Sequence, residues 1–232
     1  MASIPEPERR FFILITNVLN DVNMLFKLTI LSNKHRENII ELKAQESLTF
    51  FILVLLAGKL WEGWKMLGKE FFGSKLSMQY DPVLSSKAKV ALQNLKDYFG
   101  KGDNLINFIR NKVGFHYKHG DEILEILDES SDEERFELYL SQAQGNCFYY
   151  MATILTSSLI LTRINRSDLP KALDSFFEQI VSQVSEWLQI FLQDCLILIT
   201  KKYLDAKYEI TEIDITGPPS INEVNIPYFL MK

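Results

Sequence analysis

The sequence predicts an all-α fold: a bundle of long helices with a short irregular or β-like C-terminal tail. Apolar residues recur at spacings of three and four over long stretches, which is typical of amphipathic helices. The chain of 232 residues has only 10 glycines and 7 prolines, and several of these prolines sit near the ends. Its 16 Phe, 9 Tyr and 3 Trp supply ample bulk for a core. We divide it into a helical bundle over residues 1–207 and a tail over residues 208–232.

The first part of the chain predicts two long helices. Glu8–Ser32 has one apolar face and a polar face rich in asparagine. Glu37–Phe72 follows, and its centre, Leu48–Ala57, is apolar all round, as expected of a helix surrounded by others. Gly73 ends this helix, and we expect a loop over 73–82.

The rest of the bundle is divided by capping residues and glycines. The expected helices run from Ser85 or Ser86 to Phe99, from an Asp103 N-cap through Val113, over Phe136–Arg163, and from Ser167 or Asp168 to about Ala206. Tyr208–Ile215 alternates in polarity and predicts a short strand. The late apolar patch Ile226–Met231 is expected to dock on the bundle or on a partner subunit.

Composition and charge limit the classes of function. The net charge of −5 is unlike that of a protein coated with nucleic acid, so any such contact should be local. Cys147 and Cys195 lie in apolar helical runs, which indicates buried thiols in a reducing compartment. No signal peptide precedes the first apolar stretch, Leu48–Gly58 is too short to span a bilayer, and Cys147–Thr162 contains several Ser and Thr. We therefore expect a cytoplasmic protein without membrane contact.

The sign of the charge changes sharply near the middle of the chain. Residues 87–119 contain seven Lys or Arg against two acids, and residues 121–137 contain nine acids against the single base Arg135. The basic block can form a local site for an anionic ligand. We interpret the acidic block as a solvated connection that shields this site or aids solubility.

The candidate chemistry lies in Asp103–His119, where Arg110, Asn111 and His116 are close in sequence. An arginine, an amide and an imidazole suit cleavage of RNA by its own 2′-hydroxyl without a metal. His116 is the candidate base, since an unperturbed imidazole titrates near neutrality. The planar fork of Arg110 suits charge on the phosphate oxygens, and Asn111 would orient the imidazole or the phosphate.

Three nearby side chains are weaker candidates for holding RNA: Lys112, Lys118 and His119. We predict neither a metal nor a cofactor, because the chain has no metal-ligand cluster, no Gly-rich phosphate loop and no nucleophile elbow.

The motif resembles the signature of the HEPN superfamily, an arginine and a polar residue followed after a short spacing by a histidine. The resemblance covers Ile109–His116 and the all-helical context, and it is greatest to HEPN proteins of abortive-infection and toxin type. It implies a helical bundle that forms a homodimer, metal-independent endoribonuclease activity with both motifs at the dimer interface, and an antitoxin-like partner. Some HEPN relatives have a tyrosine two positions after the histidine as a modification target. Here Lys118 holds that position and the tyrosine is Tyr117, which puts this form of regulation in doubt.

Other interpretations of these residues remain open. Positions six apart on an ideal helix point about 120° away from each other, so periodicity alone does not bring Arg110 and His116 together. Arg110 could instead pair with an acid such as Asp121 or Glu122. Glu62, between two tryptophans, is either a partly desolvated carboxylate or a surface residue paired with Lys59 or Lys65.

Two functions compete with the nuclease. The first is a non-catalytic helical module that binds RNA, a nucleotide or a protein partner through the same basic groove. The second is a structural scaffold. Exposure of Arg110 and His116 towards a common cleft favours a site, whereas burial of either residue against an acid favours the scaffold.

Overall fold

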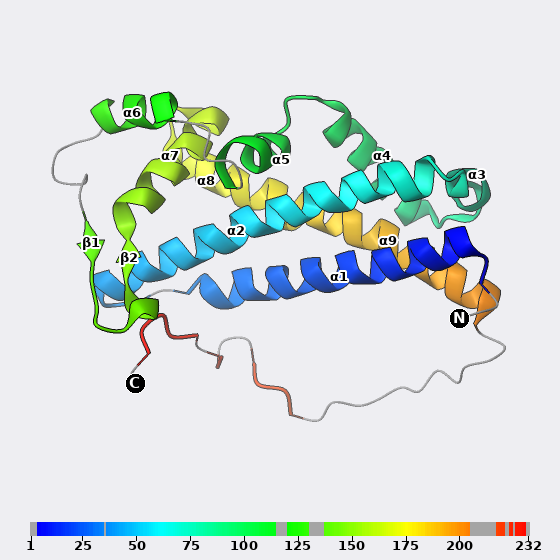
Figure 1. Ribbon diagram of the computed structural model, residues 1–232, viewed down its shortest axis with the longest axis horizontal. Helices are drawn as coiled ribbons and strands as arrows, with labels where there is room; N and C mark the ends of the chain where they lie inside the picture. Colours follow the sequence, from blue (N-terminus) through cyan, green and yellow to red (C-terminus); the bar gives the residue numbers. More distant parts are fainter. Residues whose placement is uncertain are drawn as a thin grey trace.

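The computed structural model describes residues 4–34, 36–114, 120–129, 137–204, 217–220, 223–224 and 226–230, and within these ranges the fold is an all-α bundle (Figure 1). The predicted fold class is confirmed. In chain order the elements are α1 Glu6–Ser32, α2 Ile39–Leu67, η1 Gly68–Phe72, α3 Leu76–Tyr80, η2 Asp81–Val83, α4 Ser86–Gly100, α5 Leu105–Phe108, η3 Ile109–Gly114, α6 Gly120–Glu129, β1 Leu138–Tyr139, η5 Gln144–Asn146, β2 Phe148–Tyr149, α7 Tyr150–Asn165, α8 Leu169–Phe177, η6 Glu178–Val184 and α9 Ser185–Tyr203.

Helix α2 is the central helix of the bundle and contacts α1, α5, α7 and α9 (Figure 1). It begins at the N-cap Asn38, whose side chain accepts hydrogen bonds from the amides of Ile40 and Glu41. Buried residues lie on all of its faces, among them Leu53, Leu56 and Leu60. Most of the run that is apolar all round in the sequence is therefore buried or partly buried, as expected of a helix enclosed by others, whereas Phe51 within it is 59% exposed.

Helix α1 packs along α2, and its N-terminal end meets the C-terminal end of α9. The carboxylate of Glu8 is buried there, accepts a hydrogen bond of 3.0 Å from the Tyr203 hydroxyl and lies 3.7 Å from Nζ of Lys202. These contacts join two elements far apart in the chain (Figure 1). By length and composition α1 could also cross a membrane, but Phe11 and Ile15 pack in the core of the bundle.

The long predicted helices continue through π-helical segments. η1 prolongs α2 to Phe72, which is the predicted end of the second helix, and η6 joins α8 to α9. Asp168 caps α8 by accepting a hydrogen bond from the Lys171 amide, and Ser85 caps α4 in the same way, as predicted.

Two sequence predictions in the middle of the chain are wrong in detail. The loop expected over 73–82 contains α3 and most of η2. Asp103 does not cap the next helix, because Asn104 does so: its side chain accepts a hydrogen bond from the Asn107 amide. The carboxylate of Asp103 instead forms an ion pair with Arg163.

The helix predicted over Phe136–Arg163 is also wrong in its first part. Leu138 and Tyr139 pair antiparallel with Tyr149 and Phe148, so a short hairpin precedes α7. The rings of Tyr139 and Phe148 stack at 4.4 Å between centroids. The intervening turn contains Gly145, and glycine disfavours a helix interior.

The acidic block is not only a connection, since its first part forms helix α6. The strand predicted over Tyr208–Ile215 lies outside the described residues. The described part of the C-terminal patch, residues 226–230, docks on the hairpin: Leu230 and Asn146 exchange hydrogen bonds, and the ring of Tyr228 lies 5.3 Å from that of Phe148. Of the cysteines, Cys195 is buried as predicted, whereas Cys147 is only partly buried.

Candidate functional site

The segment that carries the predicted motif is a short helix with a π-helical end. α5 starts at Asn104, whose Nδ2 also donates to the carbonyl of Lys101 at 2.8 Å. The chain then continues as η3, in which Ile109 and Val113 are buried and anchor the segment in the core. A π-turn inserts an extra residue into a helix and is frequent at functional sites.

Gly114 allows η3 to lie directly against α2. An ideal Cβ on Gly114 would lie 2.5 Å from Cγ1 of Val54, a distance that side chains do not adopt. Only glycine therefore permits this approach without a shift of the Val54 side chain or of the segments that carry the two residues. Consequently the end of η3 is held next to the buried centre of the bundle.

Among the described residues, one local and one distant side chain hold Arg110. One terminal nitrogen donates to Oδ1 of Asn111 at 2.8 Å, and the other donates to Oε1 of Glu62 on α2 at 3.3 Å. The side chain of Arg110 is 33% exposed and that of Glu62 is 59% exposed. The guanidinium is therefore oriented by protein groups yet remains accessible to solvent.

Asn111 is oriented in turn by an amide of the preceding turn. Its Nδ2 donates to Oδ1 of Asn107, and Nδ2 of Asn107 donates to the carbonyl of Gly102 at 2.7 Å. Arg110, Asn111 and Asn107 thus form a continuous hydrogen-bonded chain that ends on the backbone before α5. Such a chain restricts the rotamers of the residues that would contact a ligand.

A cavity of about 490 Å³ opens beside the guanidinium of Arg110. Its walls are apolar and come from α1 and α2, with Met24, Leu25 and Leu55 among the lining residues. Its charged lining consists of Arg110 and Glu62 together with Asp21 and Lys59, which form an ion pair of 2.8 Å. The cavity has the volume of a small-molecule site and carries two cationic and two anionic side chains.

The structure brings together only part of the predicted site. Arg110 and Asn111 are in contact, and Lys112 is exposed on the same segment. The predicted base, His116, and the predicted RNA-holding residues Lys118 and His119 lie outside the described residues.

Glu62 does not pair with Lys59 or Lys65, the two lysines expected as its partners from the sequence. It pairs with Arg110, whereas Lys59 pairs with Asp21 and Lys65 lies over the ring of Trp61 at 5.6 Å. The sequence offered no signal for this pair, because its two members are 48 residues apart.

Asn107 was also missed as part of the site. It stands four positions before Asn111, and residues at this spacing are neighbours on one helical face. The spacing was therefore a usable signal for this hydrogen bond.

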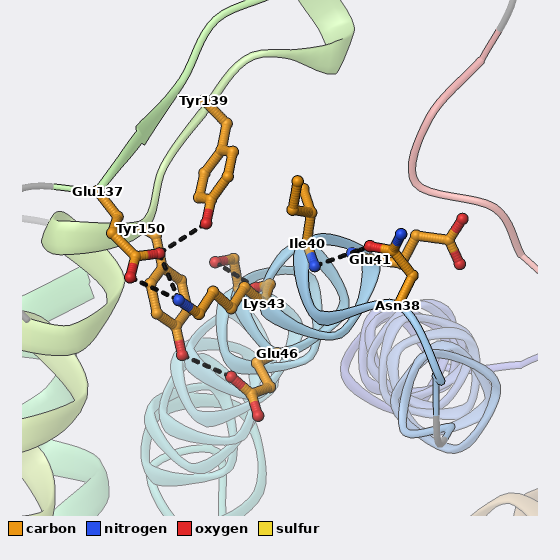
Figure 2. A network of polar contacts seen from close by, with 9 residues as sticks. Asn38, Ile40, Glu41, Lys43, Glu46, Glu137, Tyr139 and Tyr150 are labelled. Atoms are coloured by element: carbon orange, nitrogen blue, oxygen red, sulfur yellow. Dashed lines mark hydrogen bonds and ion pairs between the residues drawn. The ribbon is translucent and has the colours of Figure 1, made fainter.

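A second polar cluster lies at the other end of α2 (Figure 2). Nζ of Lys43 binds the carboxylate of Glu137, which also accepts a hydrogen bond of 2.6 Å from the Tyr139 hydroxyl. The hydrogen bond from Lys43 lowers the pKa of Glu137 and raises that of Lys43. Nearby, the Tyr150 hydroxyl donates a hydrogen bond of 2.7 Å to Glu46. Burial raises the pKa of Tyr150. This cluster ties the hairpin to α2.

No family model matches the chain, and no curated protein or solved structure matches it. Its function must therefore be inferred from its own residues. Within the described ranges no group of three or more His, Cys, Asp or Glu is placed to hold a metal ion.

Proposed function

We propose that the protein is a metal-independent endoribonuclease of HEPN type with a toxin or phage-defence role. The observation that supports this function best is the position of Arg110, which lines a cavity, is oriented by Glu62 and Asn111, and keeps a third of its side chain exposed. A guanidinium held in this way can receive a phosphodiester through two parallel hydrogen bonds.

In the proposed reaction the 2′-oxygen of the RNA attacks the adjacent phosphorus. His116 removes the proton of the 2′-hydroxyl, the bond from the 2′-oxygen to phosphorus forms, and the bond to the 5′-oxygen breaks. The 5′-oxygen leaves as a hydroxyl after it gains a proton from water, and His116 later returns its own proton to the solvent. The products are a 2′,3′-cyclic phosphate and a 5′-hydroxyl end, and no metal takes part. Arg110 neutralises the charge that builds up on the non-bridging oxygens.

The ion pair with Glu62 is compatible with this role. Partly exposed ion pairs contribute only about 0–1 kcal/mol, so one phosphate oxygen can replace Glu62 as the partner of Nη2. The second phosphate oxygen would accept a parallel hydrogen bond from an N–H of another guanidinium nitrogen. Glu62 would then hold the guanidinium ready in the absence of RNA. Lys112, exposed on the same segment, would hold the neighbouring phosphate together with Lys118 and His119.

Homodimerisation through the face of α1 would complete the site. Met24 of α1 is 60% exposed and also lines the cavity beside Arg110. Burial of such a side chain against a second copy is favourable, and it would bring the partner's surface to the mouth of the cavity.

Cleavage of a mixed RNA pool in EDTA tests the proposal, with wild type compared with His116→Ala and with the matched control His35→Ala. We expect cleavage by wild type and by His35→Ala, with 2′,3′-cyclic phosphate ends, and at least a hundredfold slower cleavage by His116→Ala. Equal cleavage by all three proteins would contradict the assignment. Because an antitoxin-like partner would mask activity, the sample must show a single chain on a denaturing gel.

A second candidate is a non-catalytic module that binds RNA, a nucleotide or a protein partner at the same place. The two ion pairs at the cavity favour it over the nuclease for a protein partner, because they leave the described lining without net charge. This candidate predicts RNA or nucleotide binding that depends on Arg110 without any cleavage product.

A further inference from the structure

A second cavity, of about 480 Å³, lies where the end of α1 meets α2, α7 and α8. This volume falls within the range of sites that enclose small organic ligands. It shares no lining residue with the cavity beside Arg110. A ligand bound in this second cavity would therefore occupy a different site from the RNA proposed to bind beside Arg110.

The lining of the cavity changes from polar to apolar along its length. α2 and α7 run in the same direction here, since Tyr150 bonds to Glu46 and Thr153 bonds to Ser47, so both helices begin at the polar end. Further along α2 the lining becomes Phe50 and Leu53. From Glu46 to Leu53 the helix rises by about 10 Å.

The far end of the cavity is lined by apolar side chains from three helices. This lining includes Leu53 of α2, Leu161 of α7 and Phe177 of α8. Leu173 of α8 lines the edge of the cavity, and 40% of its surface is exposed. An apolar body of about 10 Å would remove this surface from water, at about 25 cal/mol for each Å² buried.

At the polar end, Glu46 has hydrogen-bonding capacity left over. Its Oε2 accepts the hydrogen bond from Tyr150, and within the described part of the chain Oε1 has no hydrogen-bond partner. Three other polar residues of the wall are engaged with each other: the Thr49 hydroxyl donates to Oγ of Ser32 at 3.1 Å, and Gln45 donates to the carbonyl of Ser32. Two more bond to groups outside the lining or to the backbone, because Thr153 donates to Ser47 and Ser157 donates to the carbonyl of Ile154. Glu46 is thus an anionic group of the lining that is able to receive a ligand's hydrogen bond.

Two cations lie close to this end, and both have anionic or carbonyl partners. Nζ of Lys34 donates to the carbonyl of Val224 at 2.6 Å, and Lys43 forms its ion pair with Glu137. Lys34 thus contacts the C-terminal tail, and Lys43 contacts Glu137 at the start of the hairpin. Lys34 itself lines the cavity, but the described contacts of both cations are with groups other than Glu46, which is the anionic side chain of the lining.

We propose that this cavity binds a small amphipathic amine, with its ammonium group on Glu46 and its alkyl or aryl body along Phe50, Leu53 and Leu161. The body accounts for the apolar walls, and the charge-assisted hydrogen bond to Glu46 fixes the orientation. An anionic amphiphile would place a negative head group against the carboxylate of Glu46, so we expect it to bind more weakly than the amine. Equal or tighter binding of the anion is the opposite outcome of the test.

Calorimetric titration of the full chain with 4-phenylbutylamine and with 4-phenylbutyrate tests this proposal, since the two probes share a body and differ in head charge. We expect the amine to bind at least tenfold more tightly than the carboxylate. Glu46→Gln should weaken amine binding at least tenfold, because the glutamine can still accept the hydrogen bond from Tyr150 but has no charge. Glu41→Gln makes the same change on α2 outside this cavity and should leave binding unchanged.

Two larger side chains test the position of the body. Ser157→Phe and Leu173→Trp each add bulk to the lining and should abolish binding, and thermal unfolding shows which of them folds. The proposal is overturned if the carboxylate binds as tightly as the amine, if Glu46→Gln binds the amine like wild type, if a folded filling variant still binds it, or if wild type binds neither probe at millimolar concentration.

Discussion

The guanidinium of Arg110 lies 3.3 Å from the carboxylate of Glu62, which is 48 residues earlier in the chain. This contact joins the π-helical segment η3 to the central helix α2 and places a cation beside a cavity. Both side chains are partly exposed, so the pair contributes little to stability and acts mainly by orienting Arg110. The proposed chemistry depends on that orientation.

Replacement of Glu62 by glutamine tests this orienting role. We expect Glu62→Gln to change the free energy of unfolding by less than about 1 kcal/mol, because the ion pair is partly exposed. We expect the rate of RNA cleavage to fall by about tenfold, since the guanidinium loses a charged partner that limits its rotamers. Chemical denaturation and an RNA cleavage assay measure the two effects, with Glu41→Gln as a control on the same helix. A large loss of stability with unchanged cleavage would make the pair purely structural.

The contact between Gly114 and Val54 gives a prediction about stability. Gly114→Ala would place a Cβ 2.5 Å from Val54 and should destabilise the fold by about 1–3 kcal/mol. Removal of the obstructing methyl groups in Gly114→Ala/Val54→Ala should restore part of this loss, so the two effects should not add. Gly100→Ala is the control, because nothing lies within 4 Å of its Cβ position. Equal stability of all three variants would mean that η3 does not pack on α2 as described.

Exposed Met24 provides a test of the proposed dimer. Met24→Glu should reduce dimerisation at least tenfold, because a carboxylate would be buried at the interface, and cleavage should fall with it. Met78→Glu makes the same change at a methionine that is 75% exposed on α3, away from the cavity, and should have no effect. Light scattering over a concentration series measures the oligomeric state. An unchanged dimer in Met24→Glu would place the interface elsewhere.

The ion pair between Lys43 and Glu137 predicts a window of pH for its contribution to stability. The pKa of Glu137 is lowered, so its stabilising effect is present above its ordinary value of 4.5 and is lost as the pH falls through the lower folded value. The pKa of Lys43 is raised, so its effect is present below 10.5 and is lost as the pH rises through the higher folded value.

Glu137→Gln should therefore differ from wild type by a constant amount, about 1 kcal/mol or less, between about pH 6 and 9. The difference should shrink in acid and in strong base. Denaturation at a series of pH values measures it. A difference that grows in acid would mean that the carboxylate is not held by the lysine.

The helical part of the fold was predictable because burial leaves a strong pattern in long helices. The apolar centre of α2 indicated its enclosure, and Ser85 and Asp168 indicated two helix starts through their capping chemistry. The hairpin was missed because its aromatic residues, such as Phe148, suit a helix core as well as a strand. The glycine in its turn was the signal that should have decided against a helix.

The site was predictable only where its residues are close in sequence. Arg110 and Asn111 are adjacent, and their contact follows from local geometry. The pairing of Arg110 with Glu62 depends on how η3 packs on α2, which requires Gly114 and the buried Ile109. Such long-range contacts are set by tertiary packing and leave no periodicity in the sequence.

The most direct test of the central claim is RNA cleavage in EDTA by Arg110→Lys beside wild type. The substitution keeps the positive charge but removes the planar fork that binds two phosphate oxygens. The proposed function predicts that Arg110→Lys remains folded by circular dichroism and cleaves at least a hundredfold more slowly than wild type. Cleavage by Arg110→Lys at the wild-type rate would contradict the claim that this guanidinium stabilises the reacting phosphate.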